Sequence, residues 1–86
     1  MDAKKIVLEV GEAELHFTVS LDDYNRFVNE TMPADKISPS LRFLRRCVDP
    51  KDAAALKTFT DQGLTMDIVS ALVEEFRPRL EIMAKK

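Results

Sequence analysis

The chain has 86 residues, a formal net charge of −2 and a sequence pI near 5.3, with 45% hydrophobic and 33% charged residues. This length predicts one small domain over residues 1–86, with little room for an enclosed active site, and the apolar content is enough to form a core. The weakly acidic balance argues against binding of nucleic acid or anionic membranes by the surface as a whole.

Cysteine usage and the start of the chain bear on the compartment. Cys47 is the only cysteine, so no intramolecular disulfide can form and a reducing cytoplasm is expected. The short apolar run after Lys5 already includes Glu9. We therefore expect neither a signal peptide nor a membrane span.

Residues 6–19 have the pattern of a β-hairpin. Apolar and polar residues alternate on both sides of Gly11, which can adopt the positive φ that a tight turn needs. One face of the hairpin is polar. The other should pack against helices and comprises Ile6, Leu8, Val10, Leu15, Phe17 and Val19.

A first helix is predicted over residues 21–31. Ser20 and Asp23 have the spacing of a capping box, and Pro33 ends the helix or forces a turn. Five side chains share its apolar arc: Leu21, Tyr24, Phe27, Val28 and Thr31.

A second helix is predicted over residues 39–48, where Ser38 can cap and Pro39 can occupy the first helical position. Its apolar half contains Leu41, Phe43, Leu44, Cys47 and Val48. The other half carries three basic residues at i, i+3 and i+4 spacing: Arg42, Arg45 and Arg46.

Two further helices follow. Asp49 and Pro50 predict a helix over residues 50–60, with Leu56 and Phe59 as buried anchors and Gly63 near its end. Thr65 can cap a helix over residues 66–77, whose apolar stripe comprises Ile68, Val69, Leu72, Val73 and Phe76. Beyond Pro78, residues 80–83 alternate in part, which favours a third strand beside the hairpin over a helical tail. The expected fold class is α+β.

No catalytic, metal-binding or phosphate-binding motif is present in the sequence, so we expect no enzyme activity, cofactor or metal. His16 lies on the polar face of a predicted strand, where no partner for general base or metal chemistry is evident. Cys47 lies on an apolar helix face, where free cysteine commonly packs as a small hydrophobe.

Charge is segregated along the chain. Residues 8–30 have a net charge of −5 and residues 36–51 a net charge of +4. Such polarity can steer an acidic partner helix onto the second predicted helix, or pair copies of the chain head to tail. The plain alternative is a solvated helix face with intramolecular ion pairs. Nucleic acid is a weaker candidate, because aromatic residues do not interleave with the arginines.

The order of these segments resembles the small tail assembly chaperones of tailed bacteriophages and prophages. The resemblance covers nearly the whole chain and is carried by Asp23-Tyr24-Asn25, Pro33, Lys36, Pro39, Phe43 and Leu44, by the stretch from Asp52 to Leu56, and by Glu74-Glu75-Phe76 and Leu80-Glu81-Ile82. It implies a non-enzymatic protein of the host bacterial cytoplasm. Such a protein binds the long tape measure protein and keeps it soluble until tail tube subunits polymerise around it.

The resemblance transfers no binding residues. Our hypothesis from the residues is that Arg42, Arg45 and Arg46 contact acidic stretches of the client, while Tyr24 and Phe27 line its groove or fill the core. The alternative function is a small nucleic-acid-binding regulator that uses the same arginine face against phosphates.

Overall fold

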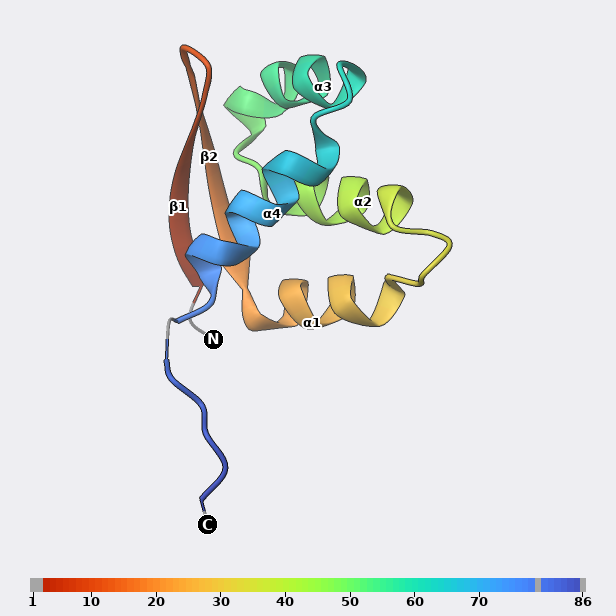
Figure 1. The fold of residues 1–86 in the computed structure, drawn as a ribbon. Helices are drawn as coiled ribbons and strands as arrows, with labels where there is room; N and C mark the ends of the chain where they lie inside the picture. Colours follow the sequence, from red (N-terminus) through yellow and green to blue (C-terminus); the bar gives the residue numbers. More distant parts are fainter. Residues whose placement is uncertain (1–2, 79, 86) are drawn as a thin grey trace.

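The computed structural model describes residues 3–78 and 80–85, and it confirms an α+β arrangement in which an N-terminal hairpin packs against helices (Figure 1). The elements in chain order are β1 (Ala3–Val10), β2 (Ala13–Ser20), α1 (Leu21–Glu30), α2 (Ile37–Cys47), the 3-10 turn η1 (Pro50–Asp52), α3 (Ala53–Asp61) and α4 (Thr65–Phe76).

The hairpin forms as the alternation predicts. β1 and β2 are antiparallel, with Val10 opposite Ala13, and Gly11 takes a φ of 61° in the turn between them. The face that bears Ile6 and Phe17 is buried, whereas Val7 on the opposite face is 52% exposed. Helices therefore cover one face of the sheet and leave the other to solvent (Figure 1).

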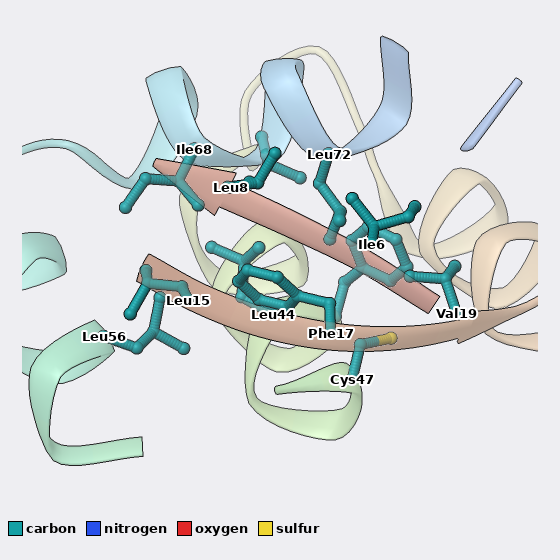
Figure 2. Packing of buried hydrophobic residues seen from close by; sticks show 12 residues of the cluster. Ile6, Leu8, Leu15, Phe17, Val19, Leu44, Cys47, Leu56, Ile68 and Leu72 are labelled. Atoms are coloured by element: carbon teal, nitrogen blue, oxygen red, sulfur yellow. The ribbon is translucent and has the colours of Figure 1, made fainter. Parts of the chain in front are cut away.

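The core lies between the inner face of the hairpin and helices α2, α3 and α4 (Figure 2). The predicted anchors Leu56 and Leu72 are buried there, and Phe59 and Val73 pack at its margin. The buried hydrophobic residues are Ile6, Leu8, Leu15, Phe17, Val19, Phe43, Leu44, Cys47, Leu56, Ile68, Val69 and Leu72.

Helix α1 begins as predicted but packs less deeply. Both reciprocal bonds of the capping box form: the Asp23 backbone N–H donates to Ser20 Oγ, and the Asp23 carboxylate accepts from the Ser20 backbone. However, no residue of α1 is buried. Leu21 and Val28, which we predicted on the packed arc, are 53% and 48% exposed, because Phe27 packs against the core in place of these two side chains. That part of the prediction was wrong.

The helix starts differ from the predicted caps at two places. Helix α2 begins at Ile37 rather than at Pro39, because hydrogen bonds between Met32 and Asp35 close a turn that already brings Lys36 to helical angles. Pro39 then sits in the first turn, where its missing N–H needs no intrahelical partner. Thr65 is the first residue of α4 instead of its cap. The predicted Asp49 cap is confirmed, since its carboxylate accepts the Lys51 N–H at 3.0 Å.

We predicted a third strand at residues 80–83, and this prediction was wrong: among the described residues the sheet has two strands, β1 and β2. Helix α4 ends at Phe76 with Arg77 extended and Pro78 following, so the chain leaves the helix instead of turning back. Residues 80–85 carry no regular secondary structure and run away from the domain (Figure 1).

Candidate partner-binding surface

Helix α1 partly neutralises the basic face of α2. Arg42 Nε lies 3.3 Å from Glu30 Oε1, and Arg26 binds the other oxygen of the same carboxylate at 3.3 Å. Desolvation raises the pKa of Glu30, but the hydrogen bonds from Arg42 and Arg26 outweigh it and hold the pKa below its usual value. Arg42 is thus engaged within the molecule, although its side chain is about half exposed.

The side chain of Arg46 is less exposed than that of Arg42 and also contacts α1. Its Nη2 donates to the Asp23 backbone oxygen at 3.3 Å, and its Nε lies 3.6 Å from Asp23 Oδ1, which is an ion-pair distance longer than a hydrogen bond. Burial raises the pKa of Asp23, but the bonds from Ser20 and the Arg46 charge together bring it below its usual value. Asp23 therefore links the capping box to α2.

Arg45 lies apart from the other two arginines. It is exposed and, within the described part of the chain, forms no ion pair. Its side chain borders a hollow of about 270 Å³ between α2 and α3, lined by Leu41, Leu44, Arg45, Val48, Ala53, Leu56, Lys57 and Thr60. The structure thus divides the predicted arginine face into an internally paired stripe and one unpaired cation.

An apolar groove of about 510 Å³ runs between α1 and α4, and the residues that follow α4 lie at one end of it. Phe27 forms one wall and also stacks on Phe43 in the core, with ring centroids 4.8 Å apart. Tyr24 packs instead on Phe76, at 5.4 Å. The lining residues are Phe27, Met66, Val69, Ser70, Val73, Glu74, Arg77 and Pro78.

The residues that could carry chemistry have structural roles. His16 has a partner that its place in the sequence did not suggest: Asp52 Oδ2 accepts the His16 backbone N–H at 2.8 Å and lies 2.9 Å from Nδ1. Those two bonds lower the pKa of Asp52. Burial, followed by the nearby charge of Asp23, raises the pKa of the Cys47 thiol to about 12, so the thiol is a poor nucleophile. Among the described residues, no three His, Cys, Asp or Glu side chains cluster as metal ligands would.

Comparison with known proteins identifies the family. The family model described as phage tail assembly chaperone matches residues 6–86. The chain belongs to the phage tail assembly chaperone family. A search of curated proteins and a search of solved structures found no significant match.

The resemblance seen in the sequence is thereby confirmed for this tail assembly chaperone, and families of this kind are generally non-enzymatic. In the described part of the chaperone, no helix has the length and apolar content to cross a membrane. The groove between α1 and α4 was missed in the sequence. The signal that could have found it lies on α4, where Met66 extends the apolar stripe that already contains Val69 and Val73.

Proposed function

We propose that this chaperone binds the tape measure protein in the host cytoplasm and keeps it soluble until the tail tube polymerises. The observation that carries the proposal is the open apolar groove between α1 and α4 in a member of the tail assembly chaperone family. A groove lined by Phe27, Met66, Val69 and Val73 suits the apolar face of an amphipathic helix.

The basic residues add a second contact in this proposal. Arg45 offers an unpaired charge to acidic stretches of the client, whereas Arg42 and Arg46 must exchange their bonds to Glu30 and Asp23 for bonds to the client. Such an exchange gains less than a new ion pair, because one carboxylate replaces another. We therefore expect Arg45 to contribute most among the three.

The same pairing weakens the alternative function. Two of the three arginines already neutralise carboxylates of α1, which leaves little net positive charge on this face for a phosphate backbone. Duplex DNA binding at low salt would favour the regulator over the chaperone.

The test is co-expression of the chaperone with the tape measure protein of the same phage, followed by measurement of soluble client and of co-purification. Ser70→Trp fills the groove from an exposed position of α4 without removing a core side chain, and Ala54→Trp is its matched control on the exposed face of α3. Arg45→Glu reverses the unpaired charge, and Lys36→Glu, at the exposed position just before α2, is its control.

We expect Ser70→Trp and Arg45→Glu to lower soluble client, and both controls to leave it near the level of the unmodified chain. Addition of NaCl should reduce the difference that Arg45→Glu makes, since exposed charges are screened. If both test variants retain as much soluble client as their controls, neither the groove nor Arg45 belongs to the binding site.

A further inference from the structure

The outer edge of β1 presents unpaired backbone groups. In β2, the His16 N–H donates to Asp52 and the His16 C=O accepts the Asp49 N–H at 2.8 Å, so both groups point away from β1. In an antiparallel ladder, the residue opposite such a position also points its N–H and C=O outward, and this orientation recurs at every second residue. Val7 is opposite His16. Lys5, Val7 and Glu9 therefore direct their N–H and C=O groups to the outer edge of β1.

The two edges of the sheet differ. The chain at Val48 and Asp49 bridges to β2 and closes part of its outer edge. By contrast, no described residue outside the hairpin bonds to the backbone of Lys5, Val7 or Glu9, and β1 lies at the margin of the fold (Figure 1). An open edge of this kind is a template for another strand.

The inner side of the β1 edge offers apolar contact for an added strand. A hollow of about 180 Å³ lies between β1 and α4 and receives no residue from β2, so it is on the free side of the sheet. Leu8, Val10, Ile68 and Ala71 supply its apolar lining. Side chains of a third strand that faced α4 would cover this surface.

Residues 80–85 have the pattern of the missing strand. Leu80, Ile82 and Met83 are 73%, 89% and 76% exposed, which is unfavourable for three large apolar side chains. Leu80, Ile82 and Ala84 fall on one face of an extended chain, and Glu81, Met83 and Lys85 fall on the other. One face is apolar and one is mainly charged, as an added strand requires here.

The charges select a direction for the pairing. On the outer face of β1, Lys5, Val7 and Glu9 follow one another at every second position. In a parallel alignment Glu81 lies beside Lys5, Met83 beside Val7 and Lys85 beside Glu9, so both charge pairs are opposite in sign. An antiparallel alignment with Met83 beside Val7 would place Glu81 by Glu9 and Lys85 by Lys5. Like charges on neighbouring strands are destabilising.

The exit of the chain from α4 points to a second molecule. Arg77 has ψ of 135°, an extended conformation that the following Pro78 favours, and residues 80–85 run away from their own β1 (Figure 1). We propose that residues 80–85 of one copy add, in parallel, as a third strand to the outer edge of β1 in a second copy. Exchange of identical segments between two copies closes a dimer with little change to either domain.

Backbone pairing gives a matched pair of variants. In the parallel alignment Lys5 bonds to the Leu80 C=O and the Ile82 N–H, whereas the Met83 N–H points away from β1. Ile82→Pro removes a paired donor and a side chain that would face α4, whereas Met83→Pro removes an unpaired donor and a side chain on the outer face; both side chains are exposed in the single copy. We expect Ile82→Pro to weaken self-association by about tenfold or more, and Met83→Pro to weaken it clearly less. Sedimentation velocity over a range of protein concentrations measures both.

The charge register has its own check. Lys5→Glu should weaken the dimer about two- to fivefold, and Lys5→Glu combined with Glu81→Lys should restore it. Restoration by the double variant is not expected from a general loss of stability. If the double variant is as weak as the single one, the parallel register is wrong.

Cross-linking separates exchange between copies from closure within one. A Val7→Cys chain mixed with a Met83→Cys chain of different mass should form a mixed disulfide, while Thr18→Cys on the outer face of β2 should not. Native Cys47 is buried and will not compete. A monomer at all concentrations without the mixed disulfide overturns the proposal, as does an intrachain disulfide in the monomeric Val7→Cys/Met83→Cys chain. These experiments need no client, so their failure leaves the proposed function untouched.

Discussion

The capping box at Ser20 allows a direct test of what holds α1 in place. Ser20 Oγ accepts the Asp23 N–H at 3.1 Å and donates to Asp23 Oδ2 at 2.9 Å. Ser20→Ala removes both bonds and leaves the Asp23 N–H to solvent. Loss of an N-cap hydroxyl costs about 1 kcal/mol, within a range of about 0.5–2 kcal/mol. We expect Ser20→Ala to lie in the upper half of that range, because the lost bonds also orient the carboxylate that pairs with Arg46.

The free energy of unfolding from urea titration, followed by circular dichroism, measures this cost. We expect the urea concentration at the unfolding midpoint to fall with little change in the m-value. The melting temperature should fall by about 4–8 °C for each kcal/mol lost in a domain of this size. Amide exchange should quicken most in α1, which has no buried residue to hold it once its cap is lost. Asn25→Ala, at an exposed position of the same helix, is the control and should not destabilise the domain.

The pH dependence of the Ser20→Ala effect follows from Asp23. Its pKa in the folded chain lies below the value of about 3.9 in an unfolded chain, so its contribution is present above about pH 4 and is lost as pH falls through the folded pKa. The difference between the unmodified chain and Ser20→Ala should therefore shrink in acid. A difference below about 0.3 kcal/mol at pH 7, where a cap should contribute most, would refute this account of α1.

Two further predictions concern single side chains. With a pKa of about 12, the Cys47 thiol should resist iodoacetamide at pH 8 in the native state and react fully in denaturant, and rapid native alkylation would contradict its burial. Because the pKa in the unfolded chain is about 8.5, the stabilising effect of the buried thiol should be complete below that pH and should be lost as pH rises toward 12. Asp52→Asn should make the free energy of unfolding fall less steeply in acid, because the lowered pKa of Asp52 gives stability that is lost as pH falls through that pKa. If the free energy of unfolding of Asp52→Asn falls in acid as steeply as that of the unmodified chain, Asp52 does not contribute to it.

Local signals predicted most of the fold from the sequence. The alternation around Gly11 and the Ser20–Asp23 spacing act over a few residues, so the hairpin and the start of α1 could be assigned without knowledge of their neighbours. The start of α2 was misplaced because a turn outside the helix, between Met32 and Asp35, decides it. A capping residue before proline is a common start, but it competes with any upstream turn that already supplies helical geometry.

Contacts between distant segments were beyond such rules. His16 and Asp52 are separated by 36 positions, and only the packing of η1 against the edge of β2 brings the carboxylate to the imidazole. The groove between α1 and α4 likewise depends on how α1 packs against the core. The apolar arc of α1 predicted deeper burial of this helix than the structure shows. An amphipathic pattern predicts which face of a helix is apolar but not whether a neighbour covers it.

The arginines of α2 show how geometry changes a correct pattern. Arg42 and Arg46 are one turn apart and form a stripe, while Arg45 is rotated by about 100° from Arg46. Because α1 lies against α2, the stripe meets the acidic residues Glu30 and Asp23, and only Arg45 stays unpaired among the three. The acidic residues of 8–30 and the basic residues of 36–51 thus serve in part to join two helices of the same chain. A client that competes for the stripe must displace these carboxylates, which is why charge reversal of Arg45 alone tests partner binding without disturbing the fold.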